Sequence, residues 1–297
     1  MRILLFLLII TSLECFSQDK NFFDDFQGIK NGETVFYENH GISISTETYS
    51  YRFNEKGLKR VFRKYKLNFK KAVKLIDSEL GVENYFVKKT EKIIGDYKLY
   101  STVYFIKNNE FITVMTFNGL KNIQPSFEKT FIKNFFQNKI PKTIYVAPKI
   151  DTIQFVKRPI RLVSSCQWMG VRNVQCPFNG QMDWTMHETI EDAREFNKIR
   201  EALTTKKKKI KLISRKSIDV IFEGKKTKAI KIVYDIRGIQ SLLVNLSSGA
   251  KNLIVYYIAE TIRGKNVSCI LSHWDNDHLQ ANGLPALLGE VMQLPLK

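Results

Sequence analysis

Cysteine, histidine, proline and glycine are all scarce in this chain of 297 residues. It contains 4 Cys, 4 His, 7 Pro and 15 Gly, and 44% of its residues are hydrophobic. So little glycine and proline excludes collagen-like and low-complexity chains, and the hydrophobic content is that of a chain with a buried core. A G-x-S-x-G elbow, a Walker loop and an H-E-x-x-H sequence are also missing. Their absence removes the commonest sequence signs of serine-hydrolase, nucleotide and zinc-protease chemistry.

Long hydrophobic runs are missing except at the start of the chain. An apolar run from Ile3 to Leu13 follows Arg2, and small residues flank Phe16 just before Gln18. This pattern predicts a signal peptide over residues 1–17, because the run is too short for an ordinary membrane span. We therefore expect an exported protein, periplasmic or extracellular and associated with the cell envelope, with no transmembrane span after signal removal. A lipid anchor on Cys15 is the competing interpretation, although Ser12 and Glu14 do not fit that signal.

Removal of residues 1–17 leaves three cysteines. Cys166 and Cys176 bracket two short strand-like runs about a turn near Gly170. An oxidising compartment favours a disulfide between them across the hairpin. Cys269 lies in an apolar run and is expected to be a buried thiol.

Basic residues outnumber acidic ones throughout the chain. The formal net charge is +18, from 47 Lys and Arg against 29 Asp and Glu. Because the excess of basic residues is spread evenly along the chain, it indicates a surface that is basic overall and not a basic tail. We expect an envelope protein or an anionic envelope surface as partner, and no nucleic acid, since export separates the protein from it.

The chain is expected to divide near residue 145, where Pro141 and Pro148 interrupt the patterns. We predict an N-terminal domain over 18–145 and a C-terminal domain over 146–297, both of the α+β class. Each of these two similar halves is expected to be a mostly antiparallel sheet with helices on one face, because strand-like runs follow one another with short turns. An echo between 103–106 (VYFI) and 255–258 (VYYI) predicts an internal repeat.

Two helical patterns with basic faces are predicted within residues 58–80. Apolar side chains recur on one face of 58–65 and of 69–80, and Asn68 and Gly81 provide start and stop signals for the second. The opposite faces are cationic, which is typical of docking to an anionic surface and also of an ordinary solvated helix face. The cations that would bind an anionic surface are Lys59, Arg60, Arg63, Lys64, Lys70, Lys71 and Lys74.

Further helices are predicted from Pro125, from Ile190 to Leu203 and from Pro285. Thr189 and Asp192 give the second of these a helix-start signature. Asp183 and Glu188 beside His187 could serve acid-base chemistry, but that helix start also explains acidic residues there.

One stretch near the end of the chain carries metal-capable side chains. It reads Ser-His-Trp-Asp-Asn-Asp-His over residues 272–278 and follows a predicted strand. Imidazole and carboxylate groups are ligands for zinc or manganese. The stretch resembles the SH-x-D-x-DH metal-binding loop of metallo-β-lactamase-fold hydrolases. That resemblance implies that His273, Asp275, Asp277 and His278 hold a catalytic ion. Alternatively, the acidic residues form a turn and the histidines are hydrogen-bonded loop residues.

These patterns favour a non-enzymatic binding or scaffolding role in the envelope, with no cofactor. No complete catalytic constellation can be assembled, since the family above needs further ligands downstream and His278 is the last histidine. The first alternative is a divalent-metal-dependent hydrolase using the 273–278 loop. The second is an anionic-membrane-surface binder that uses the basic residues of 58–80.

Overall fold

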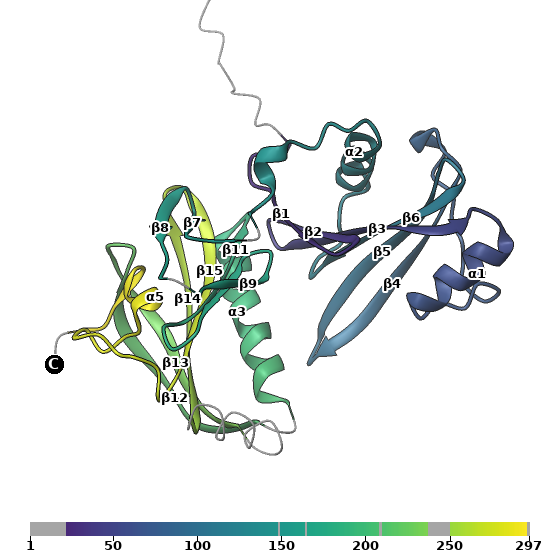
Figure 1. The fold of residues 1–297 in the computed structure, drawn as a ribbon. Coiled ribbons are helices and arrows are strands. Elements are labelled where there is room, and N and C mark those ends of the chain that lie inside the picture. The colour runs from purple at the N-terminus through teal and green to yellow at the C-terminus, as the bar shows by residue number, and fades with distance from the viewer. Residues whose placement is uncertain (1–21, 148, 164, 208–209, 237–249, 296–297) are drawn as a thin grey trace, which may run out of the picture.

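The computed structural model describes residues 22–147, 149–163, 165–207, 210–236 and 250–295 (Figure 1). The predicted signal peptide lies outside these residues. Of the described residues, 51% are in strands and 19% in helices. The predicted α+β class is therefore wrong, because the protein is mostly β and is built on two large antiparallel sheets. Short β-hairpins, rather than helices, connect most of the strands that are neighbours in both sequence and space.

The first sheet contains six of the described strands in the order β1-β2-β3-β6-β5-β4. All five neighbouring pairs are antiparallel, and the pairing of β3 with β6 joins the first three strands to the last three. The two edges of this sheet are therefore β1 and β4. The strands are β1 (Gln27–Asn31), β2 (Thr34–Asn39), β3 (Ile42–Arg52), β4 (Asn84–Ile94), β5 (Tyr97–Asn108) and β6 (Phe111–Gly119).

Helices lie on both faces of the first sheet, which corrects the prediction of helices on one face. Helix α1 (Glu55–Lys64) packs with Val103 and Phe105 of β5, whereas α2 (Pro125–Phe136) packs with Tyr104 and Ile106. Successive residues of a strand point to opposite faces, so an unbroken apolar run such as 103–106 indicates a strand covered on both sides.

The predicted second helix over 69–80 is wrong. Residues 66–77 are irregular, and a 3₁₀ turn covers only Ser78–Leu80. Phe69 joins the cluster on the α1 face and Leu80 the cluster on the α2 face, so this segment passes around the β4 edge. Midway, Leu75 exchanges two backbone hydrogen bonds of 2.9 Å with Phe86 of β4. Edge pairing therefore satisfies part of the backbone in place of a helix.

The second sheet contains eight of the described strands in the order β16-β12-β13-β14-β15-β11-β10-β9. Its strands are β9 (Gln167–Gly170), β10 (Asn173–Cys176), β11 (Gly180–His187), β12 (Ile210–Phe222), β13 (Lys225–Ile236), β14 (Asn252–Ile262), β15 (Lys265–Trp274) and β16 (Met292–Gln293). The strand β9 lies at one edge and is one wall of the site described below.

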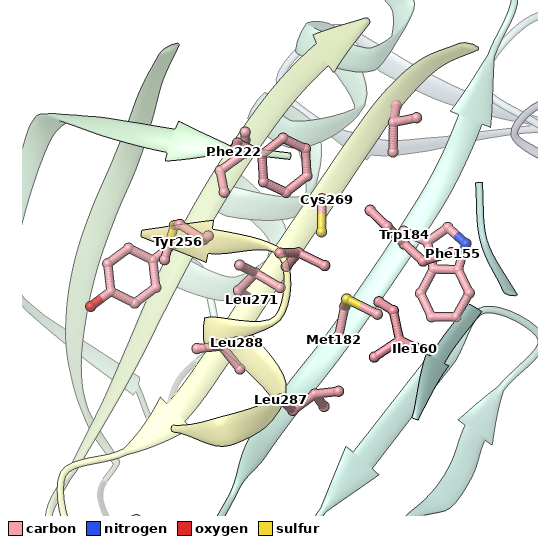
Figure 2. Packing of buried hydrophobic residues seen from close by; sticks show 14 of the residues in the cluster. Phe155, Ile160, Met182, Trp184, Phe222, Tyr256, Cys269, Leu271, Leu287 and Leu288 are labelled. Carbon is pink, nitrogen blue, oxygen red and sulfur yellow. The ribbon is translucent and has the colours of Figure 1, made fainter. Parts of the chain in front are cut away.

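One face of the second sheet carries the larger hydrophobic cluster, which Figure 2 shows around Trp184, Cys269 and Leu271. A hairpin of β7 (Thr152–Phe155) and β8 (Arg158–Arg161) and the short helix α5 (Ala286–Gly289) complete this cluster. Helix α3 (Ile190–Thr205) packs on the other face against β14 and β15. Thr189 caps it, as predicted, by accepting a hydrogen bond from the Asp192 backbone N–H at 3.1 Å.

The two sheets order their strands in the same way. In each sheet, three consecutive antiparallel strands are followed by a helix and then by a second run of antiparallel strands. The last strand of the second run pairs with the third strand of the first run, as β6 pairs with β3 and β15 with β11. The echoed runs 103–106 and 255–258 lie in β5 and β14, the neighbours of those last strands. The internal repeat and the boundary at residue 145 remain predictions, and the sheets differ in size and in what covers them.

Candidate functional site: a cleft between the two sheets

A cleft of about 1340 Å³ lies between the first and second sheets. One wall is formed by β1, β2, β3 and the end of β6, and the other by β9, β10, β11 and α3. The segment around Tyr145 that joins the two sheets lies at its border. A cleft where two sheets meet is a common place for a ligand site in a protein built this way.

Apolar side chains line the outer parts of both walls. Phe36 on β2 is 39% exposed, Met169 on β9 is 54% exposed and Tyr145 is 38% exposed. Trp168 and Phe196 also border the cleft and are partly buried. Exposed apolar groups on facing walls indicate a binding surface, because a ligand that covers them removes apolar area from water.

A buried ion pair crosses between the sheets beside the cleft. Glu38 of β2 and Arg172 are both buried and form a salt bridge. Glu38 also accepts a hydrogen bond from the Gly41 backbone N–H at 2.8 Å. Burial raises the pKa of Glu38, and the guanidinium of Arg172 opposes that shift. Arg172 donates to the backbone oxygen of Asp25 at 2.5 Å as well, so this single side chain holds two segments of the first sheet's half.

A second charged pair lies on the opposite wall. The Asp183 carboxylate of β11 lies 2.8 Å from an Arg200 nitrogen of α3 and accepts a hydrogen bond from Asn173 at 3.2 Å. Gln181 donates to Asn173 at 2.7 Å. Burial raises the pKa of Asp183, Arg200 lowers it and the nearby charge of Glu38 raises it. Three cleft-lining side chains on three elements, Asn173, Asp183 and Arg200, are thus held in fixed positions.

The cleft is bordered by two sheet edges. Strands β1 and β9 are the terminal strands of their sheets, so one side of each is not hydrogen-bonded to a further described strand. Among the described residues, the outer side of β1 has a single bridge, between Gly28 and Tyr145. The Gln27 side chain donates to the backbone oxygen of Val171, just after β9. The two edges therefore approach each other at the border of the cleft.

Near the cleft, charged side chains also connect the two halves of the chain. Asp25 lies 3.0 Å from His40 and 2.7 Å from Lys265 of β15. His187, at the end of β11, lies 2.9 Å from the Ser268 hydroxyl. Gly41 has φ +80°, and a Cβ there would lie 3.3 Å from the His187 ring, so only glycine allows this close approach without strain.

The disulfide predicted between Cys166 and Cys176 is present, with a sulfur-to-sulfur distance of 1.96 Å. It joins the start of the β9 segment to the end of β10, where Gln167 pairs with Gln175. The bond therefore fixes the edge strand that borders the cleft. Cys269 is buried and unpaired, and burial raises the pKa of its thiol well above the usual value.

The two carboxylates of the predicted metal loop are used to organise the backbone. Asp275 accepts hydrogen bonds from the backbone N–H groups of Lys251 at 2.9 Å and Asn252 at 3.1 Å. Asp277 accepts one from the Trp274 backbone N–H at 3.2 Å. Both therefore make the turn contacts that the alternative interpretation expects.

The two histidines of this loop have separate neighbours. His273 is buried, stacks on Tyr256 and lies with Nδ1 2.8 Å from the Trp274 backbone oxygen. His278 is exposed and stacks on Phe178. Among the described residues, no group of three or more His, Cys, Asp or Glu side chains is placed to hold a metal ion. The four side chains of the predicted metal centre therefore do not form such a group in this structure, and the metal centre stays a prediction.

The predicted anionic-surface residues lie near one another despite the missing helix. Lys59, Arg63 and Lys70 line one hollow beside α1, and Lys71 is exposed close by in the sequence. The other three predicted cations lie over aromatic rings. Lys64 lies 4.1 Å from the Tyr49 ring centre, Arg60 lies over Tyr51 and Lys74 over Phe69.

Sequence reasoning missed most of the cleft. Glu38, Arg172 and Arg200 lie far apart in the chain and form no local motif. The sequence places Asp183 only near His187, whereas its side chain lies on the cleft wall with Arg200. No local sequence signal could have found this site, because it depends on how the two sheets meet.

No protein family and no curated protein matches the chain. Among solved structures, DynU16 from the dynemicin biosynthetic locus is 8% identical, with a TM-score of 0.18, over 85% of this chain and 76% of that chain. This similarity is too low to inform the fold or the function. None of the helices in the described part of the chain has the length and hydrophobicity that a membrane span requires.

Proposed function

We propose that this is an exported binding protein of the cell envelope whose cleft holds an extended peptide segment of a partner protein. The observation that carries the proposal is the cleft between two sheet edges, with apolar walls and fixed charged pairs. The cysteine pair and the lack of a membrane-spanning helix in the described residues are compatible with export.

The size of the cleft favours a polymer segment over a compact metabolite. Small-molecule pockets are typically about 300–1,000 Å³, whereas this cleft is about 1340 Å³. An extended peptide also satisfies unpaired backbone groups at a strand edge, since it can add to the sheet as a further strand. Edge pairing provides affinity, and Phe36 and Met169 provide apolar contacts for alternate side chains.

The charged pairs favour recognition over catalysis. Glu38 and Asp183 each contact an arginine, Arg172 and Arg200 respectively. Each guanidinium opposes the rise in carboxyl pKa that burial causes, and the charge-assisted contact holds both side chains in place. We therefore assign these pairs to positioning the walls and to contacting polar groups of the peptide.

The proposal can be tested with linear peptides selected from a random displayed library against the mature, oxidised protein. A selected peptide is labelled with fluorescein and titrated by fluorescence polarisation. Phe36→Asp and Met169→Asp should each weaken binding at least tenfold, because a buried carboxylate replaces an apolar contact. A peptide N-methylated at alternate positions should lose binding, since it cannot donate to a strand edge.

Two exposed residues outside the cleft provide matched controls. Leu212 and Ile213 on β12 are 40% and 53% exposed, against 39% for Phe36 and 54% for Met169. Leu212→Asp and Ile213→Asp should leave the affinity unchanged. The proposal fails if the control variants weaken binding as much as the cleft variants, or if N-methylation has no effect.

A further inference from the structure

Three apolar side chains stand exposed at the β4 edge of the first sheet, away from the cleft. Val73 is 75% exposed, Ile76 is 67% exposed and Leu75 is 43% exposed. We refer to these three residues as the apolar tip. Single exposed apolar residues are ordinary, but three within four positions form a patch that gains from being covered.

The chain on either side holds the apolar tip in place. Phe69 and Ala72 pack into the cluster on the α1 face, and Leu80 is buried in the cluster on the α2 face. The two backbone hydrogen bonds between Leu75 and Phe86 fix the middle of the segment to β4. The tip is therefore presented by anchored backbone on both sides.

Cations line a hollow formed by residues that precede the apolar tip in the chain. Lys59, Arg63, Lys66 and Lys70 line this hollow of about 510 Å³ between α1 and the turn that follows it. Lys59 pairs with Glu55, but Arg63, Lys66 and Lys70 form no salt bridge with any residue that the structure describes. We refer to these four cations as the basic hollow.

We propose that the apolar tip and the basic hollow together dock the protein on an anionic lipid bilayer. Apolar side chains that enter the headgroup region and lysines that contact anionic headgroups are the two parts of peripheral membrane binding. A second copy of this chain does not fit, because two basic hollows would repel each other. An acidic protein would use the cations but would not need the tip, so it is an outcome that the test must separate.

The arrangement allows membrane docking and cleft binding together. Strands β1 and β4 are the opposite edges of the first sheet, and α1 lies at the end of this sheet that is far from the second sheet (Figure 1). Docking at the β4 edge would therefore leave the cleft accessible from the aqueous side.

The test measures flotation of the full mature protein with vesicles of phosphatidylcholine containing 30% phosphatidylglycerol, beside vesicles of phosphatidylcholine alone. We expect strong binding only to the anionic vesicles and a loss of binding as salt rises, because salt screens exposed charges. Lys66→Ala with Lys70→Ala should weaken binding about 25-fold, from about fivefold for each charge near the surface. Val73→Asp with Ile76→Asp should weaken it by about a hundredfold, since two apolar side chains no longer enter the bilayer.

Matched variants control for charge and for folding. Leu212→Asp with Ile213→Asp makes the same change on exposed residues of β12, and Lys206→Ala with Lys207→Ala removes two exposed lysines after α3. Both should bind like the unchanged protein. Equal circular dichroism spectra and melting temperatures would show that all variants fold, as exposed positions lead us to expect.

Penetration of the apolar tip is measured separately with Ile76→Trp and brominated lipids. Contact with brominated chains should quench the new tryptophan beyond the quenching of the unchanged protein. The proposal is overturned if Val73→Asp with Ile76→Asp binds anionic vesicles normally. It is also overturned if the unchanged protein binds soluble polyglutamate as tightly as vesicles, because an acidic partner would then be sufficient.

Discussion

The two sheets differ in how much of their surface a helix covers, although their strands follow the same order. Helix α1 has 10 residues and α3 has 16. At 1.5 Å per residue they extend about 15 and 24 Å. The shorter helix packs at the far end of the first sheet, against Phe105 and Val114, and leaves the β1 and β2 end of the same face open. A short helix over a broad sheet therefore produces one wall of the cleft.

The second sheet shows the contrasting case. Along β14, Val255 and Tyr257 are covered on the α3 face, and Tyr256 and Ile258 lie in the cluster of Figure 2. In the open part of the first sheet, by comparison, Phe36 is 39% exposed. Within the first sheet, covered and uncovered parts of one face can thus be compared directly.

Truncation of a covered aromatic residue should have the largest effect. Phe62 of α1 is fully buried, with its ring 4.0 Å from that of Phe105 and 5.0 Å from that of Phe69. We expect Phe62→Ala to lower the free energy of unfolding by about 3–5 kcal/mol, because it leaves a cavity. Phe36→Ala, in the uncovered part, should cost less than about 1 kcal/mol. Urea unfolding measures both, and equal losses would show that the open part is covered in solution.

Loss of the buried cation between the sheets should have the next largest effect. Arg172→Met keeps an unbranched apolar stem but leaves Glu38 buried without its guanidinium. We expect a loss of about 3 kcal/mol at pH 7, the lower end for a broken buried pair, because Glu38 can take up a proton. As a control, Arg194→Met removes an arginine whose pair with Glu191 is exposed, and its cost should be below about 1 kcal/mol.

The sign of the pH dependence provides a further check on Arg172→Met. Burial already raises the pKa of Glu38 above 4.5 in the folded protein, so the folded state binds this proton more tightly than the unfolded state. The contribution is present below pH 4.5 and is lost as the pH rises through the folded pKa. The variant should therefore lose less stability at acid pH than at pH 7. A loss that is independent of pH would exclude a charged Glu38 as its cause.

The sequence predicted local elements better than it predicted coverage. Periodicity identified α1, start signals identified α2 and α3, and the succession of strand-like runs predicted antiparallel sheets. The pattern over 69–80 failed because only Phe69, Ala72 and Leu80 turn towards the core, and they do so on different faces. Periodicity cannot distinguish a helix from an irregular segment that passes around a sheet edge. The cleft could not be predicted, because its walls come from two different sheets. Glu38 lies on one wall and Asp183 on the other, and no local pattern shows how the two sheets meet.

His187, at the contact near the cleft, should make stability depend on pH. Burial lowers its pKa from 6.5 to about 4, and the charges of His40 and Lys121 act in the same direction, whereas Asp192 opposes them. The unfolded chain therefore binds this proton more readily, so the contribution is lost as the pH falls from 6.5 to 4. The loss should be about 3 kcal/mol. Urea unfolding across this range should show a flatter profile for His187→Gln than for the exposed control His278→Gln, and parallel profiles would contradict the assignment.

Removal of the helix caps should have the smallest effect and compares the two helices directly. Asn54 accepts a hydrogen bond from the Gly57 backbone N–H at 2.9 Å, and Thr189 caps α3 in the same way. Asn54→Ala and Thr189→Ala should each cost about 1 kcal/mol in urea unfolding. If both helices are held mainly by their sheets, the two losses should be equal despite the different helix lengths. A clearly larger loss for Asn54→Ala would mean that the shorter helix depends on its own first turn, and that the extent of the open sheet face is set by where α1 begins.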